Sequence, residues 1–240
     1  GLDKGFADFD DARLAYDLGQ VSLHARIKVK VGTGDGASEP GYMSTTVGRI
    51  LFNEPLPEEM GFRNERMDKG ALKRLVGEVF RRFRHEKTAE VLDKIKRIGF
   101  QYATKSGITI AIEDIRIPEQ KDGILADADV KVGQVEKQFR RGLITDDERY
   151  AEVIEIWTKA KEDVTAAVKD AMDPYGSVNL MASSGAKGNV QQISQMAGMR
   201  GLMADPAGRI IELPIRSSFR GGLTVLEYFL STHGARKGLA

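Results

Sequence analysis

Apolar residues recur at helical spacing through the middle of the chain, and this pattern predicts two long amphipathic helices. In each helix the apolar positions alternate in steps of three and four residues, and the short turn RRGLI separates the two runs. The positions are Leu125, Ala128, Val132, Val135 and Phe139, followed by Tyr150, Val153, Trp157, Ala160, Val164, Ala167 and Ala171. Such a repeat on two arms is typical of an antiparallel coiled-coil hairpin. The alternative is a pair of ordinary core helices, but the acidic, polar outer faces favour a projecting hairpin.

The second arm carries its own start signal. Thr145 and Glu148 form a capping-box pattern, in which the hydroxyl accepts from the amide three residues on and the carboxylate reaches back. At about 1.5 Å per residue, this arm would extend roughly 35–40 Å.

The first hundred residues predict a mixture of helix and strand. Residues 10–18 are predicted as a short helix, and residues 21–31 as a strand with alternating faces. Thr46 is a candidate N-cap for a helix that ends before Pro55. Residues 71–83 and 87–104 are predicted as two amphipathic helices.

A β-branched, apolar run, GITIAIEDIRIP, follows these helices and precedes the hairpin. Its composition predicts a buried strand, which Pro118 terminates.

The end of the chain combines a capping box with an apolar segment. Thr224 and Glu227 predict a helix start, and the apolar residues that follow surround the helix, so we expect this half to be buried. Gly234 and Gly238 then lie four residues apart on one face. Because each glycine costs about 1 kcal/mol against alanine in a helix, this spacing predicts a bend or a close approach of another group.

These elements predict a mainly helical α+β fold. A mixed globular α/β part (residues 1–117) is followed by the hairpin (residues 118–173), a glycine-rich segment (residues 174–221) and the terminal helix (residues 222–240).

Composition narrows the functional classes. Of the 240 residues, 41% are hydrophobic and 30% charged, as in an ordinary globular protein. The absence of cysteine excludes disulfides and thiol chemistry and agrees with a cytoplasmic location. The three histidines are far apart, and no apolar run is long enough for a membrane span. The hairpin holds fourteen acidic against nine basic residues, whereas the residues from Tyr175 onward hold three against seven, so we expect phosphate partners to meet the last third.

Two motifs suggest chemistry but also have structural explanations. Asp8, Asp10 and Asp11 could bind magnesium, yet they precede a predicted helix, where acidic side chains act as caps. The turn SSGAKGNV could cradle a phosphate with Lys187, although it lacks Walker spacing and reads equally well as a connector. The methionines near it are typical core residues.

Longer strings in the last third are highly specific. GGLTVLEYFLSTHGARKGLA resembles the start of the bridge helix in the largest (beta-prime) catalytic subunit of bacterial RNA polymerase. ASSGAKGNVQQISQMAGMRGLMADPAGRIIELPIRSSFR resembles the F-loop segment before that helix, and ARLAYDLGQVSLHARIKVKV, TTVGRILFNEPLP and GFQYATKSGITIAIEDIRIP resemble upstream blocks in the same order. The resemblance covers essentially the whole chain. It implies that the hairpin corresponds to the rim helices, the coiled coil beside the secondary channel.

The resemblance implies an internal fragment, from upstream of the rim helices to the middle of the bridge helix. The complete enzyme is a DNA-directed RNA polymerase that joins ribonucleotides by two-magnesium phosphoryl transfer. Its metal-binding aspartates would lie upstream of this fragment and its zinc sites elsewhere in the subunit, so we expect the fragment to bind no cofactor and to be inactive alone. The implied partners are the beta, alpha and omega subunits, template DNA, RNA and ribonucleoside triphosphates, with no membrane.

The resemblance also carries over individual residues. Those implied to lie near the nucleotide are Lys187, Met199 and Arg200. Those that match the bridge helix are Thr232, His233, Gly234, Arg236, Lys237 and Gly238. Lys187 and Ser194 stand where many members carry arginine; at Lys187 the charge is kept but bidentate geometry is lost.

At the hairpin tip, the residues implied to receive secondary-channel regulators of the transcript-cleavage type are Arg140, Arg141, Asp146 and Asp147. Ala151 and Glu152 differ from the residue pair that enterobacterial members carry here. In those members the pair is associated with the response to guanosine tetraphosphate.

Two hypotheses of different classes follow. In the first, the chain is a non-catalytic support within the polymerase, and its terminal helix depends on the rest of the enzyme. In the second, it is a stand-alone coiled-coil interaction module with a self-contained fold. An independent nucleotide-binding enzyme is a third possibility, for which the sequence offers no metal-ligand set.

Overall fold

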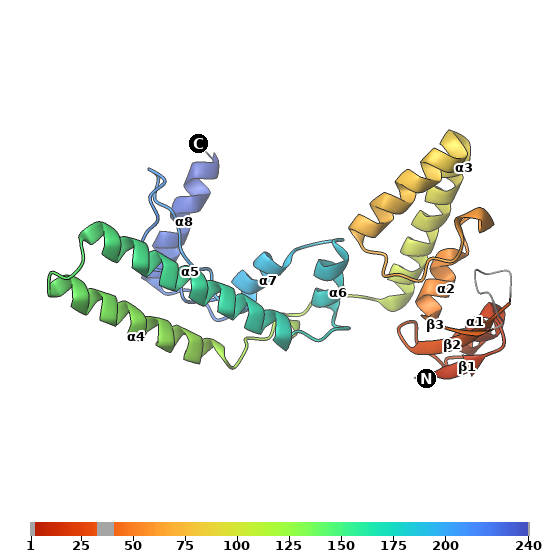
Figure 1. The fold of residues 1–240 in the computed structure, drawn as a ribbon, viewed down its shortest axis with the longest axis horizontal. Helices are drawn as coiled ribbons and strands as arrows, with labels where there is room; N and C mark the ends of the chain where they lie inside the picture. Colours follow the sequence, from red (N-terminus) through yellow and green to blue (C-terminus); the bar gives the residue numbers. More distant parts are fainter. Residues whose placement is uncertain (1–2, 33–40, 240) are drawn as a thin grey trace. The chain divides into compact units, whose positions relative to one another are not determined.

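The computed structural model describes residues 3–32 and 41–239, with side chains described up to Thr232. The chain forms two compact units, Gly1–Ile108 and Thr109–Ala240 (Figure 1). The structure is mainly helical with one small mixed sheet, which confirms the predicted α+β class.

The sheet of the first unit has three strands in the order β1-β2-β3. Strand β1 (Lys4–Phe6) runs parallel to β2 (Arg26–Val31), which pairs antiparallel with β3 (Gly41–Thr46). Alternate residues of β2 are buried, as the period-two pattern predicted. The strand begins at Arg26 rather than at the predicted residue 21, because the chain turns just before it, where the Ala25 amide donates to the Ser22 carbonyl.

Two short helices cover this sheet. Helix α1 (Phe9–Asp17) and helix α2 (Val47–Asn53) contribute buried residues to one cluster with Ile27 and Val29. The Thr46 hydroxyl accepts from the Arg49 amide and caps α2, as predicted.

Helix α3 (Lys69–Ser106) consists of two arms that fold back on each other at Arg84 (Figure 1). Arg84 has a φ of 62° and a ψ of −158°, a conformation that glycine normally adopts. Val79 of the first arm and Val91 of the second share one buried cluster with Met60 of the 3-10 helix Glu58–Met60. The two helices predicted here are therefore confirmed as the two arms.

The predicted strand before Pro118 is wrong. Residues 107–111 have no regular structure, a 3-10 turn spans Ile112–Asp114, and Ile112 is 75% exposed. The carboxylate of Asp114 accepts from the Ala111 amide at 2.8 Å and closes this turn. β-Branched composition favours a strand only where another strand can pair with it, and no described strand pairs with this stretch.

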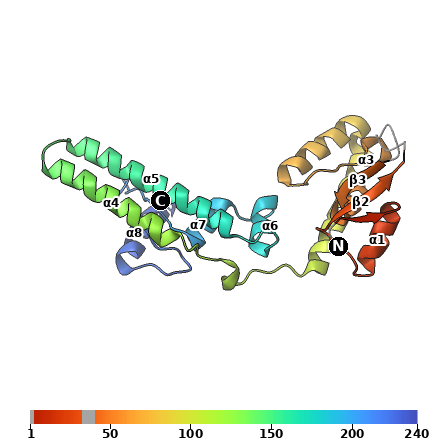
Figure 2. The ribbon, with the colours of Figure 1, turned by 60° about the horizontal axis from the view of Figure 1, so that its bottom comes forward.

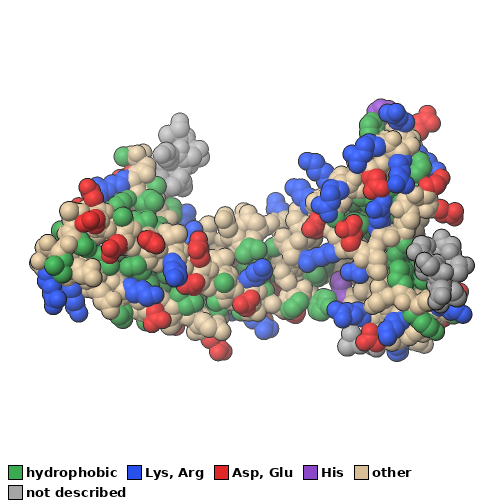
Figure 3. All heavy atoms as spheres, viewed as in Figure 1, with side chains coloured by type: hydrophobic (Ala, Val, Ile, Leu, Met, Phe, Trp, Pro, Cys, Tyr) green, Lys and Arg blue, Asp and Glu red, His purple; other side chains and the backbone are tan. Residues whose placement is uncertain are grey.

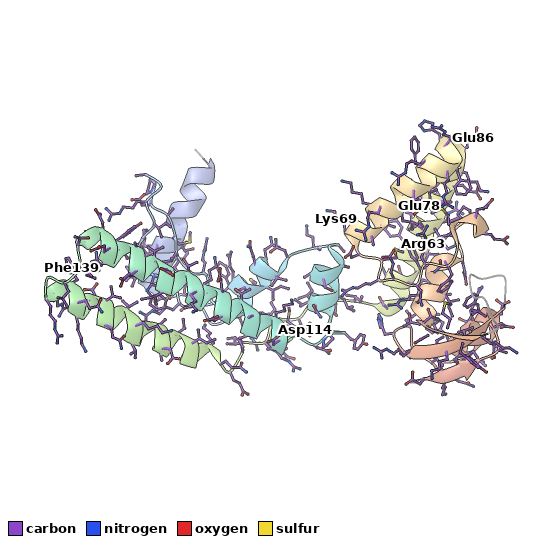
Figure 4. The ribbon with its side chains drawn as sticks, in the orientation of Figure 1. Arg63, Lys69, Glu78, Glu86, Asp114 and Phe139 are labelled. Atoms are coloured by element: carbon purple, nitrogen blue, oxygen red, sulfur yellow. The ribbon has the colours of Figure 1, made fainter. Side chains whose placement is uncertain are left out.

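In the second unit, helices α4 (Lys121–Arg140) and α5 (Asp146–Ala171) lie side by side and form a helical hairpin (Figures 1 and 2). Ala128 and Val135 of α4 join Val153, Trp157 and other buried residues of α5 in one core. The capping box of Thr145 and Glu148 is present as predicted. Phe139, labelled in Figure 4, lies near the outer end of the hairpin.

The inner half of α5 also packs against helix α7 (Val190–Ala197). For this reason Val168 is buried there. Ala167 and Ala171, which belong to the predicted apolar positions of this helix, are only partly buried. This half of α5 is a core helix contacted by two neighbours. Knobs-into-holes packing along the outer half stays a prediction.

Helix α6 (Ser177–Ser184) precedes α7, and helix α8 (Val225–Leu239) follows a segment that we call the arm, residues 199–217. Two isolated bridges, between Gly201 and Ile215 and between Ala204 and Ile210, fold the arm into a hairpin-like loop.

The expected burial of the apolar start of α8 is not found within the described part of the chain. Val225, Leu226, Tyr228 and Phe229 are between 58% and 76% exposed. Contiguous exposed apolar residues of this kind mark an interaction surface in most proteins. The sequence pattern predicts residues that avoid water, but in the described part of the second unit these four side chains stay exposed.

Candidate functional site

Lys187 lies in the tight turn that joins α6 and α7. Gly185 ends α6 in the left-handed conformation with a φ of 76°, and Gly188 has a φ of 78°. The Lys187 amide donates to the Met181 carbonyl at 3.3 Å, and the Asn189 side chain accepts from the Gln192 amide at 2.8 Å and caps α7. The backbone of the turn is thus fixed at both ends, and the Lys187 side chain is exposed.

A cavity of about 260 Å³ adjoins this turn, and Lys187, Gly188 and Gln192 are part of its wall. Most of its lining is apolar and comes from α6, α7 and the segment before α4: Ile110, Ile115, Val178, Met181, Ala182, Ile193 and Met196.

Met199 and Arg200, the other two residues expected near a nucleotide, have different environments. The Met199 side chain is fully buried in the core formed with α5 and α7. The Arg200 guanidinium stacks on the Phe219 ring, 5.2 Å from its centroid, and donates to the Ser231 hydroxyl of α8. Arg200 therefore contacts α8 directly, whereas the Met199 side chain stabilises the core below it.

Ser194 is buried in the packed face of α7. Its hydroxyl lies 2.7 Å from the Thr165 hydroxyl of α5. Next to it, Gly198 lies so close to α5 that a Cβ atom there would be 2.7 Å from a methyl group of Val164. A serine and a glycine at these positions allow α7 to pack tightly against the hairpin.

Glu227 anchors the start of α8. One carboxylate oxygen accepts from the Thr224 amide and hydroxyl, each at 3.0 Å, and completes the predicted capping box. The other oxygen accepts from the Arg216 and Ser217 amides of the arm at 2.9 and 3.0 Å. Burial alone would raise the pKa of Glu227, but these donors outweigh it and lower the pKa from 4.5 to about 2.

Of the expected bridge-helix residues, Thr232 donates its hydroxyl to the Phe229 carbonyl at 2.8 Å. The remaining ones lie in α8, but their side chains are outside the described part of the chain: His233, Gly234, Arg236, Lys237 and Gly238.

The expected docking residues lie together at the hairpin tip, residues 140–147. Arg140 ends α4, Arg141 follows it, and Asp146 and Asp147 begin α5. Asp146 forms an ion pair with Arg149 at 2.8 Å.

Arg149 is the central residue of this region, and the sequence pattern did not identify it. Its guanidinium pairs with both oxygens of Glu212 in the arm, at 2.6 and 3.0 Å, and with Glu136 of α4 at 3.2 Å. The side chain is 13% exposed and lies over the Phe139 ring. Hydrogen bonds with Glu212 and Asp146 raise the pKa of Arg149 above its already high value, so its charge is permanent.

A second contact joins the arm to α5, next to the tip. The Tyr150 hydroxyl donates to the Ile210 carbonyl at 3.0 Å, and the Arg209 guanidinium lies over the Tyr150 ring. Glu212 is more than sixty residues from Arg149 in sequence, so no local pattern could have indicated these contacts.

The acidic residues near the N-terminus act as helix caps. The Asp8 carboxylate accepts from the Asp11 amide at 2.8 Å, and Asp11 accepts from the Ala7 amide at 3.1 Å. The capping interpretation of these residues is thereby confirmed. Within residues 3–32 and 41–232, no group of three or more His, Asp or Glu side chains is arranged to hold a metal ion.

Figure 3 shows many Lys and Arg side chains gathered over α3. Residues 69–106 hold eleven basic against four acidic residues. One of the acidic residues, Glu78, is paired with Arg63 at 2.8 Å; both are labelled in Figure 4.

None of the helices in the described ranges has the length and apolar character needed to traverse a lipid bilayer.

Two family models match consecutive parts of the chain. The model described as RNA polymerase Rpb1, domain 3 matches residues 2–115, and the model described as RNA polymerase Rpb1, domain 4 matches residues 144–220. The second match includes α5, the turn with Lys187 and the arm.

Among known proteins, the chain is 56% identical over 235 residues to the DNA-directed RNA polymerase subunit beta' of Desulforamulus reducens, an alignment that covers 98% of the chain and 19% of that protein. It is 52% identical over all 240 residues to the same subunit of Pelotomaculum thermopropionicum, covering 20% of it, and 50% identical to that of Dehalococcoides mccartyi, covering 18%. The chain thus spans about one fifth of the length of the curated relatives it matches.

Proposed function

The chain belongs to the beta' subunit family of bacterial DNA-directed RNA polymerase, and we propose on this basis that it forms part of an enzyme that joins ribonucleotides on a DNA template. The observation that carries the proposal is the identity of 50–56% over almost the entire chain, with no part of the sequence left unmatched by the relatives.

Within that enzyme, this segment supports the active site and does not hold the catalytic metals. Magnesium ions would supply the Lewis-acid chemistry of phosphoryl transfer from a site formed by other residues. This division of roles is supported by the capping function of Asp8 and Asp11 and by the anchoring of α8 through Glu227 and Arg200.

Lys187 acts at the nucleotide. An exposed ammonium group on a turn fixed by Gly185 and Gly188 can reach the triphosphate while the backbone stays in place. Because a lysine acts as a point charge, its contribution is electrostatic attraction without the fixed fork of an arginine.

The partners of the segment follow from the same assignment. The exposed apolar residues of α8 are covered by other parts of the enzyme, whose subunits are beta, alpha and omega, next to template DNA and RNA. The hairpin tip with Arg140, Arg141, Asp146 and Asp147 receives transcript-cleavage-type regulators. A stand-alone interaction module is the other candidate, but the exposed face of α8 supports the larger assembly.

The test is single-nucleotide addition by the full-length subunit assembled with its partners. Lys187→Ala should raise the KM for ribonucleoside triphosphates about threefold to tenfold, the effect of one partly solvated charge contact. The maximal rate should change less, because ground-state binding is what is lost.

Two variants serve as controls for this test. Lys187→Arg should keep the KM near its original value, and Lys159→Ala, on the exposed face of α5, should leave it unchanged. An unchanged KM in Lys187→Ala would contradict the assignment of Lys187, and an inactive assembled enzyme would contradict the function as a whole.

A further inference from the structure

One arginine of the arm contacts three helices of the second unit. The Arg216 guanidinium donates a hydrogen bond of 2.7 Å to one carboxylate oxygen of Asp129 in α4 and forms an ion pair of 2.7 Å with the other oxygen. The same guanidinium lies 4.9 Å from the ring centroid of Trp157 in α5. The backbone amide of Arg216 donates to Glu227 in α8.

The side-chain contacts of Arg216 fix its direction. Because both terminal nitrogens lie at 2.7 Å from the two oxygens of one carboxylate, the contact with Asp129 sets both the distance and the plane of the guanidinium. Trp157 is only 2% exposed, so the aromatic surface beneath the guanidinium is itself held by the core. Arg216 is therefore located by both helices of the hairpin at once.

The backbone of the same residue determines where α8 begins. Glu227 accepts from the consecutive amides of Arg216 and Ser217, so its carboxylate position follows that peptide unit. One helical turn later, Ser231 accepts from Arg200 at the other end of the arm. Two anchors on one face of α8 define its direction as well as its position.

We propose that Arg216 is a positioning residue, through which the α4–α5 hairpin sets the orientation of α8. Asp129 and Trp157 hold the Arg216 side chain, and Glu227 accepts from the Arg216 backbone amide. Through these contacts α8 and the hairpin move as one rigid body. The consequence for nucleotide addition rests on the proposed function, whereas the orientation of α8 relative to the hairpin can be measured without it.

The chain is suited to a distance measurement because it contains no cysteine. Cysteines introduced at Val130 on α4 and Val225 on α8, which are 61% and 76% exposed, would carry the only two spin labels. Pulsed electron paramagnetic resonance on the full 240-residue chain should give one narrow distance distribution. Arg216→Ala should broaden it, Asp129→Ala should broaden it equally, and the double variant should add nothing further.

Three further variants separate positioning from misfolding. Arg216→Lys keeps the charge but loses the fork, and should give an intermediate width in a folded chain. Exchanging the charges, with Arg216→Asp and Asp129→Arg together, should narrow the distribution relative to either change alone. Arg140→Ala, at the exposed end of α4, should leave the width unchanged. An unchanged width in Arg216→Ala, or a charge exchange no narrower than its single changes, would overturn the proposal.

The same variants in the assembled enzyme test the consequence. Arg216→Ala should slow single-nucleotide addition at saturating substrate about tenfold, with the KM within about twofold of the original, because geometry and not substrate binding is disturbed. An inactive wild-type assembly would contradict the proposed function and leave the distance result standing. A narrow distribution in Arg216→Ala, beside an active wild-type enzyme, would refute the positioning role alone.

Discussion

At the scale of single residues, Gly198 shows how closely α7 packs against the hairpin. A Cβ atom at this position would lie 2.7 Å from Val164 Cγ1 and 2.8 Å from the Ser194 carbonyl oxygen. Gly198→Ala should therefore lower the free energy of unfolding by about 1–3 kcal/mol, the usual cost of overpacking. The midpoint of denaturant unfolding measures this change.

The matched control is the same substitution inside α4. A Cβ atom at Gly133 would meet nothing within 4 Å, so Gly133→Ala should stabilise the chain by about 0.5–1 kcal/mol through helix propensity. If both substitutions had the same sign, the close approach at Gly198 would not be the reason for its effect.

Glu227 gives the start of α8 a pH dependence of known sign. Its pKa is lowered on folding from 4.5 to about 2, so the charged form favours the folded state. The stability it contributes is complete above about pH 4.5 and is lost as the pH falls towards 2. The thermal midpoint of the chain should therefore fall more steeply between these values than that of Glu227→Gln. If the thermal midpoints of the original chain and of Glu227→Gln fell in parallel with pH, the Glu227 carboxylate would not anchor α8.

At the scale of elements, Arg149 joins the hairpin to the arm. It lies among three carboxylates, Glu136, Asp146 and Glu212, and its removal would leave them without their shared cation. Because Arg149 is nearly buried but the carboxylates are partly exposed, Arg149→Ala should cost about 1–3 kcal/mol of unfolding free energy.

A double-mutant cycle with Glu212→Ala measures how much of this cost belongs to the contact with the arm. A coupling energy of about 1 kcal/mol is expected for the bidentate pair. Arg140→Ala, nearby at the exposed end of α4, should change stability by less than about 0.5 kcal/mol. A coupling energy near zero would mean that the pair of Arg149 and Glu212 does not hold the arm to the hairpin.

The elements that could be predicted are those with local signals. Both arms of α3, both helices of the hairpin and the caps at Thr46, Thr145 and Thr224 follow from periodicity and from residues three positions apart. The failures concern long-range partners. Residues 107–118 have strand composition, but none of the described strands pairs with them. In the inner half of α5, Val168 is buried and the predicted Ala167 and Ala171 are only partly buried, because α7 packs there.

The candidate site likewise contains residues that local sequence indicates and contacts that depend on long-range partners. Specific strings indicated Lys187, Arg200 and the residues of α8 as candidate site residues, and their roles stay predictions. The contacts that hold these elements together, at Arg149 and Arg216, join segments more than sixty residues apart in sequence, and only the folded chain brings them together.

At the scale of the whole molecule, the two units make different contributions. The first, with its small sheet and the folded arms of α3, presents a basic surface, and its acidic N-terminal residues act as caps. The second unit connects the hairpin, the arm and α8 through a continuous set of ion pairs and hydrogen bonds. This organisation agrees with the proposed role of the segment as a support for chemistry performed by residues elsewhere in the polymerase.

The most direct test of that account is RNA extension on a primed DNA–RNA scaffold with magnesium and ribonucleotides. The purified 240-residue chain would be compared with the full-length subunit assembled with its partners. If the segment is a support, the assembled enzyme extends the RNA and the chain alone does not. Extension by the chain alone would contradict the supporting role, and would return Asp8, Asp10 and Asp11 to consideration as metal ligands.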